Sequence, residues 1–138
     1  MAETGEDMVR AVCEAWGQGV EPGQAALRRY FSEDCRWDQG PISGRGLAGF
    51  ATTVGPEEAA QSIGGIPQMG FTSIQVEMRN VAEAGGVVFT ERVDWLIRPD
   101  GSRVGPWLVV GVTEVSEGKI TAWRDYFDGR DMTMLTGE

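Results

Sequence analysis

The sequence has no histidine, only two cysteines, and no hydrophobic run long enough to cross a membrane. The absence of histidine excludes Ser-His-Asp and Cys-His hydrolytic mechanisms and removes the commonest zinc ligand. Cys13 and Cys35 are too few and too widely separated to form a metal-binding motif. We therefore expect no metal and no other cofactor, and two reduced thiols of the kind usual in a cytoplasmic protein.

The composition is that of one acidic globular domain. The 138 residues are 41% hydrophobic and 24% charged, so we expect residues 1–138 to form a single domain. A net charge of -9 and an isoelectric point near 4.5 argue against nucleic acid or an anionic membrane as a partner. A neutral or apolar small molecule remains allowed. Glu3, Glu6 and Asp7 precede the first apolar run, so no signal peptide is expected.

The first quarter of the chain shows helical spacing. Apolar residues recur at that spacing from residue 8 to residue 16, which predicts a first helix after Thr4 that ends at Gly17. A second helix is expected from Pro22 to Phe31, closed by residues 32–34. Both apolar stripes are expected to face the core.

The following segment is less regular. Residues 35–39 predict a short strand, broken by Gly40 and Pro41. Residues 44–49 match the dinucleotide fingerprint G-x-G-x-x-G, but no βαβ pattern follows, so a glycine-rich entry to a helix through residues 47–54 is expected instead. One or two helical turns are predicted at residues 56–61.

From Phe71 onward the hydrophobic period changes to two, which is typical of half-buried strands. Turn signals at residues 84–86, 99–101 and 116–119 divide this half into four strands. An antiparallel meander after an α-rich first half predicts an α+β domain, with helices packed on one face of a curved sheet.

Charged residues fall on an apolar face of the second of these strands. Residues two apart on a strand share a face, so Arg92 and Asp94 are expected to point the same way as Val88, Thr90 and Leu96. Charge on such a face is costly unless it is paired. This pair is therefore the first candidate site.

Turn chemistry indicates which residues lie opposite this pair. A three-residue loop at 99–101 places Arg92 opposite Leu108, and a two-residue primed turn at Glu117-Gly118 places Asp125 opposite Val110. Leu108 and Val110 share a face, so Arg92, Asp94 and Asp125 are predicted to converge. Leu108, Val110 and Trp123 are expected to line the cavity around them.

With these residues in hand, the chain resembles the limonene-1,2-epoxide hydrolase family. The most specific matches are ERVDWL at 91–96 and EGKITAWRDYFD at 117–128, with a weaker match in YFSED at 30–34. The resemblance covers roughly residues 5 to 130. It implies the cone-shaped α+β fold of the nuclear transport factor 2-like (SnoaL-like) superfamily, in which N-terminal helices pack on a curved mixed or antiparallel sheet that encloses a pocket.

The resemblance also implies a reaction: metal-free, one-step hydrolysis of an apolar epoxide to a vicinal diol. On this reading Asp94 protonates the epoxide oxygen, Asp125 takes a proton from the attacking water, and Arg92 bridges both carboxylates. The chemistry is consistent, because two carboxyls in an apolar pocket cannot both ionise cheaply and one keeps its proton. From spacing alone, a buried structural ion pair would give the same pattern.

The chain departs from the family at the water site. A tyrosine and an asparagine, two residues apart, help to hold the water in the family, and these positions are Trp37 and Gln39 here. Indole offers one N–H donor and no acceptor. Asp38, on the opposite face of that strand, would be an additional acid or base if a bulge turned it inward.

This departure keeps two alternative functions open. One is an epoxide-opening cyclase of a polyketide or polyether pathway, in which a hydroxyl of the substrate replaces water. The other is a small-molecule-binding protein that keeps the cavity without turnover.

The sheet also predicts an assembly. Alternation places many apolar side chains on the face away from the helices, more than a soluble monomer usually exposes. We expect a symmetric homodimer packed sheet to sheet, as the resemblance also implies. The residues predicted to face outward are Val87, Phe89, Val93, Trp95, Ile97, Trp107, Val109 and Val115.

Overall fold

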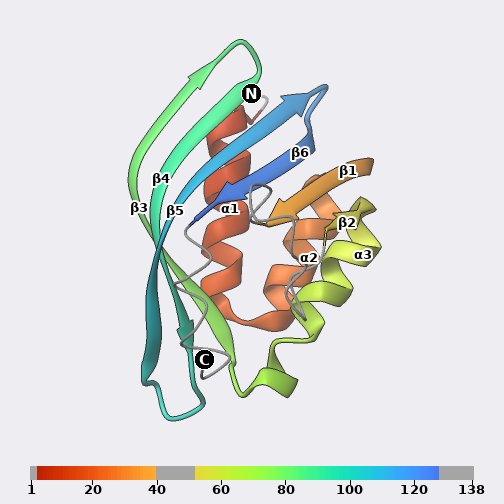
Figure 1. Cartoon of the computed structure of the whole chain (residues 1–138). Coiled ribbons are helices and arrows are strands. Elements are labelled where there is room, and N and C mark those ends of the chain that lie inside the picture. The colour runs from red at the N-terminus through yellow and green to blue at the C-terminus, as the bar shows by residue number, and fades with distance from the viewer. Residues whose placement is uncertain (1–2, 40–51, 128–138) are drawn as a thin grey trace.

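The computed structural model describes residues 3–39 and 52–127. Within them, helices pack against a curved sheet of six strands, and α1 runs along the inside of the curve (Figure 1). None of these helices is both long and apolar enough to cross a bilayer. In chain order the elements are α1 (Gly5–Gln18), α2 (Val20–Tyr30), β1 (Phe31–Gln39), β2 (Thr53–Val54), α3 (Gly55–Gly64), the 3₁₀ turn η1 (Pro67–Met69), β3 (Ser73–Ala84), β4 (Val87–Ile97), β5 (Arg103–Ser116) and β6 (Lys119–Tyr126).

The first helix begins where the sequence predicts. Thr4 is its N-cap: the Thr4 hydroxyl accepts from the backbone N–H of Asp7, and the Asp7 carboxylate accepts from that of Thr4, both at 3.1 Å. This capping box satisfies two donors that a helix start leaves free. The predicted apolar stripe, from Met8 to Trp16, is buried.

The end of the second helix differs from the prediction. Helix α2 ends at Tyr30, and β1 starts directly at Phe31 rather than at Cys35. Phe31 is extended (φ -75°, ψ 134°) and pairs with Ile120 of β6, so the sheet captures it. Pairing with β6 outweighs the helical spacing that includes Phe31.

The glycine-rich segment at residues 44–49 lies outside the described residues. Val54, which was expected to end a helix there, belongs to β2 and pairs with Arg36 of β1. The helical turns predicted at residues 56–61 are part of α3, which has Pro56 in its first turn.

The sheet confirms the predicted α+β class. Its strand order is β2-β1-β6-β5-β4-β3, and β3 to β6 form the predicted antiparallel meander. Strand β1 extends it in parallel with β6, and β2 pairs antiparallel with β1, so the sheet is mixed.

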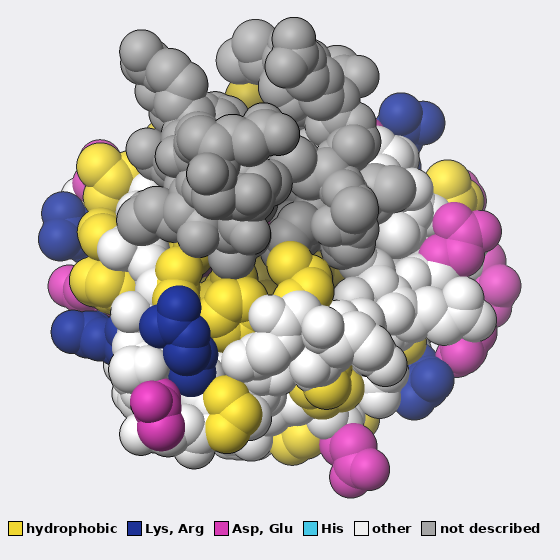
Figure 2. Space-filling model, turned by 60° about the horizontal axis from the view of Figure 1, so that its bottom comes forward, with side chains coloured by type: hydrophobic (Ala, Val, Ile, Leu, Met, Phe, Trp, Pro, Cys, Tyr) yellow, Lys and Arg dark blue, Asp and Glu magenta, His cyan; other side chains and the backbone are white. Residues whose placement is uncertain are grey.

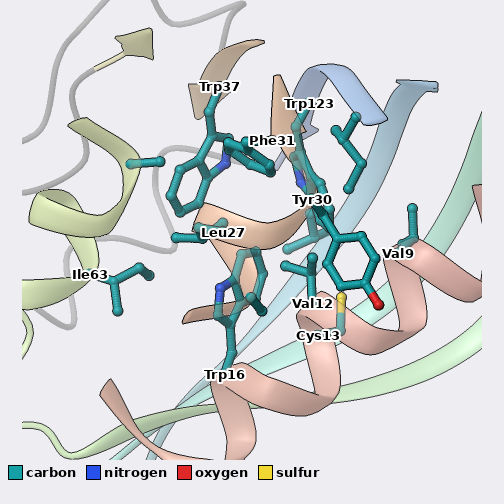
Figure 3. Packing of buried hydrophobic residues seen from close by; sticks show 14 of the residues in the cluster. Val9, Val12, Cys13, Trp16, Leu27, Tyr30, Phe31, Trp37, Ile63 and Trp123 are labelled. Carbon is teal, nitrogen blue, oxygen red and sulfur yellow. The ribbon is translucent and has the colours of Figure 1, made fainter. Parts of the chain in front are cut away.

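Aromatic side chains fill the core between α1, β1 and β6 (Figure 3). Trp16 stacks on Trp37 with ring centroids 5.5 Å apart, and Trp16 lies 5.4 Å from Trp123 in a tilted arrangement. Phe31 and Trp37 form a T-shaped pair with ring centroids 6.1 Å apart. Figure 2 shows the face of the molecule that lies at the bottom of Figure 1. Hydrophobic side chains are exposed near the middle of this face.

The β5–β6 hairpin has the predicted turn and an unpredicted bulge. Glu117 and Gly118 both have positive φ, 51° and 77°, as a type I′ turn requires. The register then shifts by one residue at Thr121, which has no partner of its own on β5. Asp125 therefore pairs with Gly111 rather than with Val110.

The β4–β5 hairpin shows the same combination. Its loop at residues 99–101 closes with Arg98 and Ser102 hydrogen-bonded at 2.9 Å, as predicted. The register then shifts by one residue at Gly105 and Pro106, since a proline cannot donate to a neighbouring strand. Arg92 pairs with Val109 rather than with Leu108.

The two bulges reverse the predicted facing of β5. Trp107 and Val109 are buried at 6% and 4% exposure, although they were expected to face outward. Leu108 and Val110 were expected to line the cavity and are instead 61% and 48% exposed on the convex face. Both β4 and β6 are shifted by one residue relative to β5. Arg92, Asp94 and Asp125 therefore still point to the same face and converge, as predicted.

Candidate active site

Arg92 lies between two carboxylates that come from different strands. Its Nε and Nη2 donate to the two oxygens of Asp94 at 3.2 and 2.8 Å, and its Nη1 donates to Asp125 Oδ1 at 2.9 Å. The Arg92 side chain is 1% exposed, against 15% for Asp94 and 7% for Asp125. The three residues predicted to converge therefore form one buried ion cluster.

The two carboxylates have different surroundings. In addition to Arg92, Asp125 accepts from the indole N–H of Trp123 at 2.8 Å and from that of Trp37 at 3.5 Å. The nitrogens of these two rings lie on their facing sides (Figure 3). All three groups are donors only, so they match a carboxylate and not a carboxylic acid. Arg92 is the one hydrogen-bond donor recorded for Asp94 in the described part of the chain.

Burial and charge set the protonation of the cluster. Burial raises the pKa of Asp94 above its ordinary value of 3.8, and Asp125 adds to this, although Arg92 opposes it. Burial alone would lower the pKa of Arg92, but Asp125 and Asp94 outweigh it and hold that pKa well above its usual value. Since one guanidinium is shared by two carboxylates, Asp94 is left to hold a proton more readily than a free aspartate does.

Gly111 was not recognised from the sequence as a site residue. A side chain on Gly111 would bring Cβ to 2.5 Å from Thr90 Oγ1, 3.0 Å from Arg92 Nη1 and 3.3 Å from Asp125 Oδ1. The missing side chain therefore makes room for the salt bridge. A glycine inside a strand pattern is the signal that points to such a close approach.

The cluster borders a cavity of about 70 Å³ between α1 and the sheet. Asp94, Asp125 and Gln39 supply polar groups to its wall. The rest of the described lining is aromatic or aliphatic, including Trp16, Trp37, Trp95, Trp107 and Phe127. A small apolar molecule with one or two polar atoms fits such a wall.

The other predicted site residues divide into two groups. Trp37 and Gln39 line the cavity, and Trp123 reaches the site by donating to Asp125. Asp38 does not turn inward: it accepts hydrogen bonds from Arg36 and Thr52 on the outer face. Burial would raise the pKa of Asp38, but these hydrogen bonds outweigh it and lower that pKa.

The cysteines contribute no nucleophile or ligand set to this site. Burial raises the pKa of Cys13 and of Cys35 to about 12, so neither thiol ionises near neutral pH. Among residues 3–39 and 52–127, no three His, Cys, Asp or Glu side chains are arranged as metal ligands.

Comparison with known proteins first defines the fold. A solved structure of an LEH-like epoxide hydrolase from M. tuberculosis superposes with a TM-score of 0.69 at 28% identity, over 94% of this chain and 87% of that one. An NTF2-like protein of unknown function from Burkholderia pseudomallei gives 0.73 at 20% identity, over 94% and 95%. The fold is therefore the NTF2-like α+β fold.

The sequence comparison then defines the family. A family model described as the limonene-1,2-epoxide hydrolase catalytic domain matches residues 44–137. Epoxide hydrolase EphG of Mycobacterium tuberculosis is 42% identical over 67 residues, which are 46% of this chain and 41% of that relative. The match thus spans less than half of the curated relative. The chain belongs to the limonene-1,2-epoxide hydrolase family.

Proposed function

We propose that this chain hydrolyses an apolar epoxide to a vicinal diol, by one-step attack of water with general acid and general base catalysis. The observation that carries the proposal is the arginine shared by two buried carboxylates at the wall of an apolar cavity. Membership of the limonene-1,2-epoxide hydrolase family and similarity to EphG support it.

Asp94 is the proposed acid. Its pKa is raised by burial, so it keeps a proton at a pH at which an ordinary aspartate is ionised. As the epoxide C–O bond breaks, its electron pair moves to the oxygen, which takes the Asp94 proton. General acid catalysis of this kind contributes about 10²- to 10⁴-fold.

Asp125 is the proposed base. The N–H groups of Arg92, Trp123 and Trp37 converge on it and favour the carboxylate form. Water attacks the epoxide carbon and gives a proton to Asp125, while the side-chain amide of Gln39 helps to hold the water. After a proton returns from Asp125 to Asp94 through solvent, the sum of the steps is the addition of one water.

A second candidate, an epoxide-opening cyclase, is favoured by one observation. Trp37, at the position of the family's tyrosine, donates to Asp125 rather than offering an acceptor to water. Among the described residues, Gln39 is then the one side-chain amide in the cavity wall that can hold water, and such a site suits a nucleophile that the substrate itself delivers. The same acid and base would then close a ring instead of forming a diol.

Incubation of an epoxide panel in ¹⁸O-labelled water tests the proposal and separates the two candidates. Hydrolysis predicts a diol that carries one ¹⁸O atom, detected by mass spectrometry. An unlabelled cyclic ether formed from a hydroxy-epoxide would favour the cyclase. Binding of amides or diols without consumption of any epoxide would contradict both and favour a binding protein.

The proposed enzyme is a symmetric homodimer that packs through the convex face of the sheet. Three large apolar side chains are exposed there: Phe89 at 46%, Leu108 at 61% and Val110 at 48%. Val112 lies beside them, paired with Phe89, whereas Val93, which was expected to face outward, is 2% exposed and adds nothing to this surface. A contiguous apolar surface of this kind favours an isologous contact.

A further inference from the structure

Trp107 carries a buried hydrogen-bond donor that no described residue satisfies. Its side chain is 6% exposed, and its indole Nε1 has no hydrogen-bond partner within residues 3–39 and 52–127. A buried N–H without an acceptor is destabilising, so most are paired in folded proteins. Trp107 also lines the cavity beside the ion cluster. A donor left free in a cavity wall points to an acceptor that arrives with the ligand.

The position of Trp107 relates this donor to the proposed acid. Trp107 pairs with Asp94 across β5 and β4, so the two side chains share a face about 4.8 Å apart at the backbone. A side chain on Gly105 would meet Trp107 Cε3 and Cζ3 at 3.0 and 3.1 Å, so this edge of the ring packs on Gly105. Nε1 lies on the other long edge of the indole and is directed away from Gly105.

We propose that Trp107 is a further catalytic residue, which donates from Nε1 to the substrate oxygen that Asp94 protonates. This inference rests on the proposed epoxide-opening function. As the C–O bond breaks and its electron pair collects on oxygen, the Asp94 proton is transferred and the Trp107 hydrogen bond shortens. A fixed donor in a dry site stabilises developing negative charge and requires no reorganisation.

Trp16 provides a matched control within the same core. Its Nε1 is also buried without a partner in the described part of the chain, and its side chain also lines the cavity. The nitrogen-bearing side of Trp16 faces α2 and α3, since Trp16 Cδ1 and Ile63 Cγ2 both lie close to Gly23 (Figure 3). Removing the Trp16 N–H therefore changes the core but not the oxygen position.

Nuclear magnetic resonance tests the donor without turnover. The chain has five tryptophans, so a ¹H–¹⁵N spectrum holds five indole signals, each assigned by a single Trp→Phe variant. Benzamide, which offers a carbonyl acceptor and no epoxide, should move the Trp107 indole proton downfield. The Trp16 indole proton, which faces α2 and α3, should show no downfield shift. Ethylbenzene, which has no acceptor, should not produce the downfield shift. A Trp107 signal that benzamide does not move would overturn the proposal.

Kinetics provide the second test. Trp107→Phe should lower kcat on an epoxide by about 10- to 100-fold with a smaller change in KM, because the hydrogen bond is strongest in the transition state. Trp16→Phe also changes the cavity wall, so once differences in folded fraction are removed it should raise KM more than it lowers kcat, because the Trp16 N–H faces away from the oxygen position. Equal kcat for the two variants would refute the role of Trp107. If benzamide shifts Trp107 but no epoxide is consumed, the proposed function fails and the donor assignment stands.

Discussion

The concave and convex faces of the same three strands each carry side chains that are unusual for their surroundings. On the concave face, β4 and β6 bury Arg92, Asp94 and Asp125 beneath a helix. On the convex face, β4 and β5 leave Phe89 and Leu108 largely exposed. A chain selected for stability alone would reverse this arrangement, since burying charge is costly and burying hydrocarbon is favourable. The site and the dimer contact proposed above would each account for one half of this arrangement.

Replacing either carboxylate is the change with the largest expected effect. Asp94→Asn and Asp125→Asn should each lower epoxide turnover by about 10²- to 10⁴-fold, because each removes one proton-transfer role. Circular dichroism should show an intact fold. Asp38→Asn is the matched control, since Asp38 lies one strand from Asp125 but on the outer face. Near-full activity of either site variant would refute the assignment.

Removal of the shared arginine should have the largest effect on stability. Arg92→Ala leaves two carboxylates buried without a cation, which costs about 3 to 5 kcal/mol in the free energy of unfolding. Urea titration measures it. Arg124→Ala breaks the partly exposed pair with Glu114 on the convex face and should cost less than about 1 kcal/mol. Similar losses in the two variants would mean that the buried cluster has no special role.

A methyl group at position 111 should disturb the site with a smaller effect. Gly111→Ala places Cβ 2.5 Å from Thr90 Oγ1 and 3.0 Å from Arg92 Nη1, which forces a shift that costs about 1 to 3 kcal/mol. Turnover should fall with stability. In α1, a Cβ on Gly17 meets nothing closer than 3.7 Å, so Gly17→Ala should be neutral or stabilising. An active, fully stable Gly111→Ala variant would contradict the packing argument.

A charged substitution on the convex face should change the oligomeric state of the protein. It should leave epoxide turnover and the free energy of unfolding nearly unchanged. Leu108→Glu introduces a carboxylate into the proposed dimer contact, and sedimentation should then show a 15.0 kDa monomer. Val54, which is 47% exposed on β2, lies apart from the Phe89, Leu108 and Val110 surface, and Val54→Glu should not dissociate the dimer. A wild-type chain that sediments as a monomer at micromolar concentration would refute the dimer proposal.

Turn chemistry and alternation predicted the meander, and they predicted the meeting of Arg92 with both aspartates, although in the wrong register. They failed for Leu108 and Val110, because each hairpin contains one extra residue beyond its turn. Pro106 inside a strand pattern is a usable signal for the first bulge, whereas Thr121 gives none. Arg92, Asp94 and Asp125 still converge because β4 and β6 are each shifted by one residue relative to β5, so their charged residues stay on the same face.

Contacts made by whole side chains lay beyond the sequence pattern. Trp37 was predicted to stand at the water site, but which atom its indole nitrogen faces depends on the packing of Trp16 and Trp123 around it. The space beside Gly111 of β5 is likewise set by side chains of β4 and β6, namely Thr90, Arg92 and Asp125. Local spacing carries no information about either.

The most direct test of the account is the titration of Asp94 itself. Aspartate labelled with ¹³C at the side-chain carboxyl gives a signal for Asp94 that is identified by its loss in Asp94→Asn. The account predicts a midpoint above the ordinary 3.8, because burial raises the pKa of Asp94 in the native state. The native protein then binds a proton that the unfolded chain has released, so stability should fall as pH rises from 3.8 through that midpoint, and less so in Asp94→Asn. A midpoint at or below 3.8 would show that Arg92 outweighs burial, and Asp94 would then have no proton to give.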